Sequence, residues 1–284
     1  MTIPIIRPVI ASALAVLALG LGSCATAPAD GPAASSRAVA QTAVTVTTSA
    51  GTADALLFTP QGSGKWPAVL VWSDLAGLRP AVADIGRRLA GEGYVVLMPN
   101  MFYRTARIDG SSAPAPLTPE QSRERSSAWM DAIGDEGGEA DAKAYLAFLD
   151  SRPEVDTARK AGVLGLQYGS PYAFHTAFAL PERIGAVAVL HPIRIATARD
   201  NSPHLSVGRS RAAYYVALAG PDDAREPADK DDLRTAFAGA GLSGAVEVLP
   251  AANGFAVSDT AAHDPASSEA AWTHAMTLFR EHLR

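Results

Sequence analysis

The nine residues from Gly162 to Ser170 constrain the fold of this chain more than any other stretch. A short apolar run turns there, through Gly165 and Gly169, directly into a segment with helical spacing. Glycines suit such a turn because strand and helix approach so closely that larger side chains would clash. This arrangement is typical of a nucleophile elbow, which lifts one side chain above the sheet. The lifted residue is Gln167, whose carboxamide is neither a nucleophile nor an acid or base near neutral pH.

Apolar strand patterns alternate with amphipathic helix patterns through the rest of the chain. We expect strands at 44–47, 55–58, 67–72, 94–98, 184–190, 213–219 and 245–249, and helices at 81–91, 120–133, 136–149, 171–179, 229–241 and 267–283. The first two strands flank Ser49-Ala50-Gly51 and predict an antiparallel hairpin at the sheet edge. The alternation as a whole predicts an α/β fold, with a doubly wound, mainly parallel sheet and helices on both faces. Residues 104–119 form a Pro- and Ser-containing loop, either disordered or the rim of a pocket.

The N-terminus has the features of a bacterial lipoprotein signal. Arg7 precedes an apolar run over 9–21, which is too short to span a membrane in a mature protein. The following Leu21-Gly22-Ser23-Cys24 resembles a lipobox, whose cysteine is diacylated and becomes the new N-terminus. Cys24 is also the only cysteine of the chain. A plain signal peptide with a chance cysteine is the alternative interpretation.

Three segments follow from this interpretation. Residues 1–23 are the lipoprotein signal peptide, 24–42 a flexible tether rich in Ala, Pro, Ser and Gly, and 43–284 one folded domain. Lipid on Cys24 would hold the protein in the cell envelope, facing the periplasm. Residue 25 is Ala and not the aspartate that commonly retains such proteins at the inner membrane, so we expect the outer membrane of a Gram-negative host.

Composition excludes some classes of partner and cofactor. The formal net charge is -5, which argues against binding to nucleic acid. The six histidines and one cysteine show no paired ligand spacing, so we expect neither a metal nor another cofactor. A small-molecule ligand and the membrane are the expected partners, and no protein partner can be inferred.

Four stretches together resemble the dienelactone hydrolase family over residues 44–284. They are Val71-Trp72-Ser73-Asp74-Leu75-Ala76-Gly77-Leu78, Gly91-Glu92-Gly93-Tyr94-Val95-Val96-Leu97-Met98-Pro99, the elbow, and Asn253-Gly254-Phe255-Ala256-Val257 with the later Trp272 and Phe279-Arg280-Glu281-His282-Leu283. The resemblance implies an α/β-hydrolase fold. It also implies a cysteine at the elbow, a histidine in a His-Gly-Phe stretch and an aspartate after the preceding core strand.

This sequence departs from that pattern at two of the three positions. Gln167 stands at the nucleophile position and Asn253 at the histidine position. Only the acid remains, as Asp223, with Asp222 the alternative if the turn is shifted by one residue. Asparagine cannot accept and return a proton as imidazole does, so the standard covalent mechanism is not available. We expect Asn253 to donate to Asp223 and Gln167 to bond the carbonyl oxygen of Asn253, each at about 2.7–3.2 Å.

The resemblance also assigns residues around the cleft. It places Asp74 beside the nucleophile position, and it matches the backbone N–H groups of Leu75 and Tyr168 to the oxyanion donors. Arg104 matches an arginine that holds a substrate carboxylate, whereas the second such position is Val257, so half of that clamp is absent. A solvated loop charge is an equal interpretation of Arg104.

Three function classes therefore remain open. One of them is a structural envelope partner that uses its surface and not the cleft, for which the sequence offers no positive mark. The favoured one is a membrane-anchored member of this fold that has lost covalent chemistry and serves a binding or accessory role. The rival is a working ester or lactone hydrolase that uses a non-standard nucleophile or a water directed by Asp74. Ser170 is a poor nucleophile because its hydroxyl should point away from the cleft, and His191 is more simply a hydrogen-bonded structural histidine.

Overall fold

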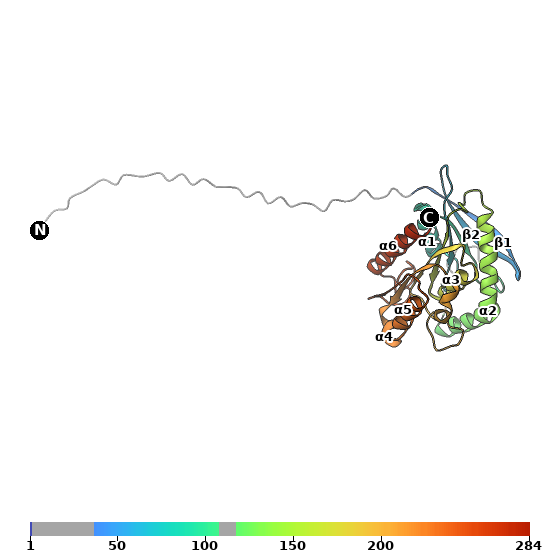
Figure 1. The fold of residues 1–284 in the computed structure, drawn as a ribbon. Coiled ribbons are helices and arrows are strands. Elements are labelled where there is room, and N and C mark those ends of the chain that lie inside the picture. Colours follow the sequence, from blue (N-terminus) through green and yellow to red (C-terminus); the bar gives the residue numbers. More distant parts are fainter. Residues whose placement is uncertain (2–36, 108–117) are drawn as a thin grey trace. The chain divides into compact units, whose positions relative to one another are not determined.

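The centre of the structure is an open sheet in the strand order β1-β2-β4-β3-β5-β6-β7-β8 (Figure 1). This computed structural model describes Met1, residues 37–107 and residues 118–284. The strands are β1 (Val39–Thr48), β2 (Gly51–Pro60), β3 (Ala68–Trp72), β4 (Val95–Pro99), β5 (Ala161–Leu166), β6 (Ile184–Leu190), β7 (Ala213–Ala219) and β8 (Gly244–Leu249). From β4 to β8 every neighbouring pair is parallel, whereas β1 and β2 pair antiparallel, as do β2 and β4.

Helices cover both faces of this sheet. They are α1 (Pro80–Gly91), α2 (Pro119–Asp150), α3 (Ser170–Ala179), α4 (Gly220–Arg225), α5 (Asp229–Gly239) and α6 (Pro265–His282), with 3-10 turns η1 (Gln167–Gly169) and η2 (Pro203–Arg209). Side chains that alternate along β3 show how the faces divide. Leu70 and Trp72 join the core beneath α2, α3 and α5, whereas Val69 and Val71 join the core beneath α1 and α6 (Figure 1). The predicted doubly wound α/β fold is confirmed.

Most predicted elements occur within a few residues of their expected bounds. The antiparallel hairpin is confirmed, with Thr48 opposite Gly51 at its tip. The two helices expected at 120–133 and 136–149 run together as α2, which is interrupted by a non-helical backbone at Gly134. The sequence patterns missed η2 and α4.

The N-terminal boundary differs from the prediction. Strand β1 already begins at Val39, so residues 39–42, expected in the tether, belong to the sheet because they pair with 57–60 of β2. The signal peptide, Cys24 and the tether up to residue 36 lie outside the described residues, as does the loop segment 108–117. No helix in the described ranges is long and apolar enough to cross a membrane.

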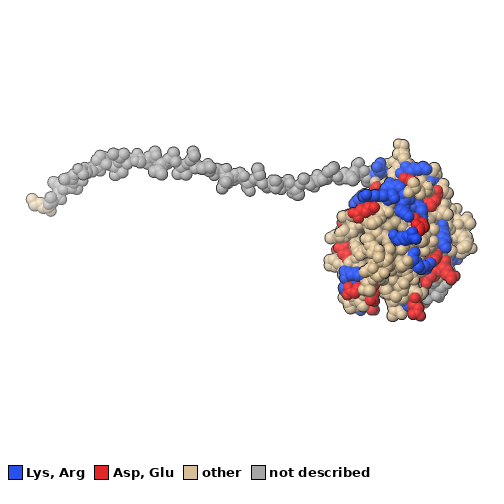
Figure 2. Space-filling view, viewed as in Figure 1, with Lys and Arg blue, Asp and Glu red and all other residues tan. Residues whose placement is uncertain are grey.

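The free edge of the sheet at β8 is partly covered by a side chain. Arg234, on α5, donates from Nη2 to the carbonyl oxygen of Val246 at 3.0 Å. Elsewhere the surface carries both charge signs, and Figure 2 shows basic and acidic side chains interspersed on the visible face.

Candidate functional site

The elbow forms where β5 ends and α3 begins. A Cβ atom on Gly165 would lie 2.8 Å from Cα of Ser170, and one on Gly169 would lie 2.5 Å from the carbonyl oxygens of Trp72 and Ser73. Both glycines are therefore required by close backbone approach. Between them Gln167 adopts φ 46°, a left-handed conformation that is uncommon for a residue with a side chain. The turn holds the half-buried Gln167 side chain above the sheet.

Gln167 is hydrogen-bonded to Asn253, as predicted. Nε2 of Gln167 donates to Oδ1 of Asn253 at 2.9 Å. The direction of this bond is the expected one. Both N–H donors of Asn253 are already used, toward the carbonyl oxygen of His191 at 3.1 Å and a carboxylate at 2.6 Å. Its carbonyl oxygen is left to face Gln167.

The carboxylate that Asn253 contacts belongs to Asp222, which corrects the assignment of Asp223 as the acid. Both aspartates lie on α4, and successive residues of a helix point about 100° apart, so one cannot replace the other. Asp223 instead accepts from Nζ of Lys230 at 2.8 and 3.0 Å. Asp222 also pairs with Arg225. The described atoms thus form a row from Gln167 through Asn253 to Asp222.

His191 lies directly beneath this row. Its ring is fully buried and packs edge-on against Phe255, with 5.2 Å between centroids. The expectation of a hydrogen-bonded histidine is wrong, because among the described residues neither ring nitrogen has a hydrogen-bond partner. Burial lowers the pKa of His191 to about 4, although the charges of Asp74 and Asp222 act in the opposite direction. His191 is therefore neutral near pH 7 and has no path to solvent.

Asp74 belongs to a buried ionic cluster. Arg79 donates to both of its carboxylate oxygens, at 2.6 and 2.8 Å, and to both oxygens of Asp259, at 2.8 and 3.0 Å. Burial opposes the charged form of Arg79, but the bonds and charges of the two aspartates outweigh it, so the pKa of Arg79 is raised. The backbone N–H of Ala76 donates to Asp74 as well, at 3.0 Å. Asp74 thus has little remaining capacity to direct a water molecule.

Arg104 is engaged by the protein itself. Its guanidinium donates to the two oxygens of Asp141, at 2.6 and 3.1 Å, and Asp141 is fully buried. The Tyr103 hydroxyl donates to the same carboxylate at 2.8 Å. An internal carboxylate therefore occupies the bonds that a substrate carboxylate would make with Arg104. Val257 is fully buried in the core beneath α6.

The two backbone groups expected as oxyanion donors lie on the loops that follow β3 and β5. Leu75 follows β3 by three residues and Tyr168 follows Gln167. The loop after β3 touches the elbow, because Gly169 lies against the Ser73 carbonyl. Ser170, considered as a substitute nucleophile, is fully buried, and its hydroxyl has no hydrogen-bond partner among the described atoms.

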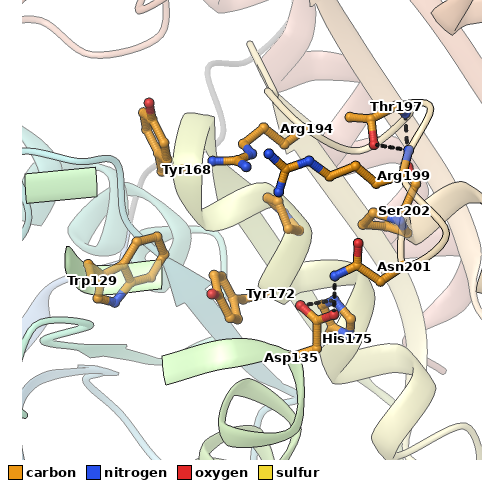
Figure 3. A pocket seen from close by; sticks show the side chains of 12 residues that line it. Trp129, Asp135, Tyr168, Tyr172, His175, Arg194, Thr197, Arg199, Asn201 and Ser202 are labelled. Atoms are coloured by element: carbon orange, nitrogen blue, oxygen red, sulfur yellow. Dashed lines mark hydrogen bonds and ion pairs between the residues drawn. The ribbon is translucent and has the colours of Figure 1, made fainter. Parts of the chain in front are cut away.

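Two hollows border the loop that follows β6. A cleft of about 760 Å³ lies between residues 192–205 and the ends of β7, α4 and α5, and Asp222 lines it. A smaller recess of about 40 Å³ lies on the Tyr168 side of the same loop (Figure 3). Arg194, Thr197 and Arg199 line both hollows. In the described ranges no group of three or more His, Cys, Asp or Glu side chains could hold a metal ion.

Sequence patterns did not indicate the charged residues that form ion pairs with Asp74, Arg104 and Asp223. Arg79, which also binds Asp259, donates to both oxygens of Asp74. Asp141 accepts from Arg104, and Lys230 pairs with Asp223. No local spacing indicates these pairs, because the partners lie 5, 180 or 37 positions apart in three of them. For Lys230, its position seven residues after Asp223 is a weak signal.

Comparisons with known proteins identify the family and the fold. The model of the dienelactone hydrolase family matches residues 53–283. A dienelactone hydrolase-like promiscuous phosphotriesterase from metagenomic libraries has a TM-score of 0.71 at 20% identity, covering 87% of this chain and 100% of that chain. Dienelactone hydrolase from Anabaena variabilis has a TM-score of 0.60 at 16% identity, covering 87% and 99%. An esterase from Pyrobaculum calidifontis has a TM-score of 0.61 at 16% identity, covering 88% of each chain.

These structural likenesses lie below 25% identity and show the fold alone, which is that of the α/β-hydrolases. Because the family model spans most of the sequence, the chain belongs to the dienelactone hydrolase family. A search of curated proteins found no match.

Proposed function

We propose that this protein is a dienelactone hydrolase family member that binds a small molecule without forming a covalent intermediate. The observation that carries the proposal is the hydrogen-bonded row Gln167, Asn253, Asp222 at the place of a nucleophile, base and acid. A carboxamide cannot attack an ester, and a second carboxamide cannot take up and return a proton. Every polar atom of the Asn253 side chain is nevertheless hydrogen-bonded, which favours a site converted to another use over one that has decayed.

The other groups near the row offer no replacement chemistry. His191 is buried, and both oxygens of Asp74 accept from Arg79. Binding is supported by the cleft of about 760 Å³ lined by Asp222, a volume in the range of small-molecule sites. An ester or lactone hydrolase acting through Asp74 would first have to break the bonds between Asp74 and Arg79.

The test is pre-steady-state hydrolysis of an activated ester by the full chain and by rebuilt variants. The unmodified protein should give no burst of product. Gln167→Cys alone should recover little, because a thiol with a pKa near ~8.5 is mostly protonated without a base. Gln167→Cys with Asn253→His should give a clear burst. Gln41→Cys with Asn253→His is the matched control, because Gln41 is exposed on β1 far from the elbow in the sequence.

Rapid turnover by the unmodified protein that survives Gln167→Ala would contradict the proposal. Loss of that turnover in Asp74→Asn would then favour the rival hydrolase that uses a directed water. A burst in the Gln41→Cys control as large as in the rebuilt variant would mean that any added thiol reacts, and the elbow would carry no special chemistry.

We further propose that Cys24 is lipidated and that the protein faces the periplasm, at the outer rather than the inner membrane. The support is the lipobox-like Leu21-Gly22-Ser23-Cys24, the lone cysteine and Ala25. Two or three acyl chains, at about 0.8 kcal/mol per buried methylene, would make a firm anchor. Membrane fractionation of Cys24→Ser tests it, with Ser23→Ala as control. The proposal fails if Cys24→Ser stays in the membrane fraction as the parent does.

A further inference from the structure

Basic side chains gather around the amino ends of the parallel strands. They come from the segments that lead into these strands and from the helix ends beside them: Arg37, Lys65, Arg152, Arg159, Lys160, Arg183, Arg211 and Arg280. Contacts join these segments. Arg159 donates to the Leu283 carbonyl oxygen at 2.9 Å, and Arg183 donates to the Arg159 carbonyl oxygen at 2.8 Å. Figure 2 shows basic side chains close together in the region where Figure 1 labels the C-terminus. We call the surface formed by the eight basic residues the amino-end face.

Four basic groups of the amino-end face have no carboxylate partner among the described residues. Arg37 and Lys65 are exposed, and their side chains form no hydrogen bond or ion pair within the described ranges. Arg159 and Lys160 donate to backbone carbonyl oxygens. The remaining arginines pair with acidic neighbours, which are Glu154, Asp150, Glu182 and Glu92. The acidic side chains of this region without a basic partner in the described part of the chain are fewer, namely Asp156 and Glu281. Positive charge is therefore in excess on this face.

The opposite end of the sheet is acidic. Helices α4 and α5 bring four carboxylates to the cleft of about 760 Å³, namely Asp223, Glu226, Asp229 and Asp232. Burial raises the pKa of Asp229 to about 6, and the charges of the other three carboxylates act in the same direction. Acidic groups are thus crowded at the cleft. An anionic surface would attract the amino-end face and repel the cleft end.

The described domain begins at the amino-end face. The backbone N–H of Arg37 donates to the carbonyl oxygen of Gly91, the last residue of α1, at 3.1 Å. Only twelve residues lie between Cys24 and Arg37. Such a chain spans about 45 Å when fully extended and about 20 Å on average when flexible. A compact domain of this size is roughly 45 Å across. A lipid on Cys24 would therefore bring the amino-end face, and not the cleft, close to a bilayer.

We propose that the amino-end face binds an anionic phospholipid surface and so turns the cleft away from the membrane. The inference rests on the proposed lipidation of Cys24 for its place in the cell, whereas the charge attraction does not require the lipid. Each Lys or Arg near an anionic bilayer strengthens binding by about fivefold, so the unpaired Arg37 and Lys65 should have measurable effects. Next to Lys65 lies the half-buried Trp66, and tryptophan rings favour the interface between bilayer and water.

Vesicle sedimentation of the full chain with Cys24→Ser tests the face without the lipid. We compare vesicles of phosphatidylglycerol with phosphatidylcholine and vesicles of phosphatidylcholine alone, at low salt. The ratio of the two partition constants isolates the effect of charge, because the apolar run 9–21 meets both kinds of bilayer. This ratio should exceed about tenfold, and Arg37→Gln and Lys65→Gln should each lower it by about fivefold.

Arg107→Gln is the matched control, since it removes an exposed arginine at the other end of the sheet. Arg107 donates there to the Thr52 carbonyl oxygen at 3.4 Å, beyond the carboxyl end of β4. Its effect on the ratio should be less than about twofold, because charges farther away than a Debye length are screened. An effect as large as that of Lys65→Gln would overturn the proposal, because the overall charge and not the face would then act.

Equal partition constants for the two kinds of vesicle would also overturn the proposal, as would a ratio that Arg37→Gln and Lys65→Gln leave unchanged. Salt separates this proposal from lipidation. At about 1 M salt the Debye length falls to about 3 Å, so a protein held by charge is released whereas a lipid anchor holds. Fractionation of the parent and of Cys24→Ser is therefore done at that salt concentration. Release of the parent would contradict lipidation, and the vesicle comparison would still decide the role of the face.

Discussion

At the scale of single residues, Asn253 uses all the polar atoms of its side chain. One N–H bonds Asp222, the other bonds the His191 carbonyl, and the oxygen accepts from Gln167. An imidazole in that place would present one donor and one acceptor and could pass a proton along the row. The carboxamide passes none, so the same backbone holds a fixed polar link where a relay would otherwise stand.

The structure predicts which aspartate would serve a rebuilt catalytic row. In the Gln167→Cys, Asn253→His background, Asp222→Asn should lower the burst rate by a factor of about 10² or more, because the imidazole loses the group that orients it. Asp223→Asn is the matched control and should have little effect, since Asp223 pairs with Lys230. Measured burst rates in which the Asp223 variant is the impaired one would contradict the orientation of α4.

His191 should make stability depend on pH. Its pKa is about 4 in the folded protein against an ordinary value of 6.5, so the unfolded chain binds the proton first. The stabilisation is complete above about pH 6.5 and is lost as pH falls toward 4, by up to about 3 kcal/mol. Urea unfolding at pH 7 and pH 4.5 measures this. His191→Asn, which tolerates the left-handed φ of 40°, should lose less stability over that interval.

His274→Asn is the control for that measurement. His274 is half-exposed and bonds Glu247, so its variant should keep the steep pH dependence of the parent. An identical loss of stability in the parent and in His191→Asn would mean that other groups produce the dependence.

The sequence located the residues of the row but not all their contacts. The glycines at 165 and 169 and the spacing to Asn253 identified Gln167 and Asn253, because they depend on a local turn and on family motifs. The choice between Asp222 and Asp223 depends on where Lys230 of α5 lies relative to α4, which is decided by tertiary structure and not by a local pattern. No sequence pattern indicated that Arg194 and Arg199 line the two hollows, because their positions depend on how the loop after β6 folds.

At the scale of elements, Arg79 joins three segments. It is the N-cap residue of α1, although its side chain does not cap the helix. That side chain binds Asp74 in the loop after β3 and Asp259 in the loop that follows Asn253. The loops that shape the site are therefore held to one another by one guanidinium. Burial of this group makes its removal more costly than that of a surface ion pair.

Arg79→Met should lower the free energy of unfolding by roughly 3 kcal/mol, because it leaves the buried Asp74 charge without its partner. Arg87→Met is the matched control; Arg87 and its partner Asp84 are exposed, and the change should be about 1 kcal/mol or less. Chemical denaturation measures both. Equal small effects would show that solvent reaches Asp74.

Helices and strands were predictable where the apolar pattern was long. The patterns at 184–190 and 213–219 match β6 and β7, whose residues are almost all buried. The start of β1 was missed because residues 39–42 are half-buried or exposed and give no clear apolar pattern. Helix α4 was missed because it is only six residues long and buries none of them.

At the scale of the whole molecule, strand order and layering follow from the alternation of elements and the crossover rule. The family was also recognisable, because motifs at four places kept their order. The hollows on either side of residues 192–205 could not be predicted, since their volume depends on how a loop with little periodicity folds back between the sheet and α5.

The guanidinium of Arg234 over the Val246 carbonyl has a consequence for crowded conditions. An uncovered strand edge can pair with the same edge of another molecule and seed aggregates. A protein tethered to a membrane, as we propose, would meet its copies in two dimensions, where such pairing is favoured. Arg234→Ala should therefore aggregate faster in light-scattering measurements, whereas Arg211→Ala should behave as the parent. The hydrogen bond from Arg234 of α5 would then reduce aggregation without taking part in ligand binding.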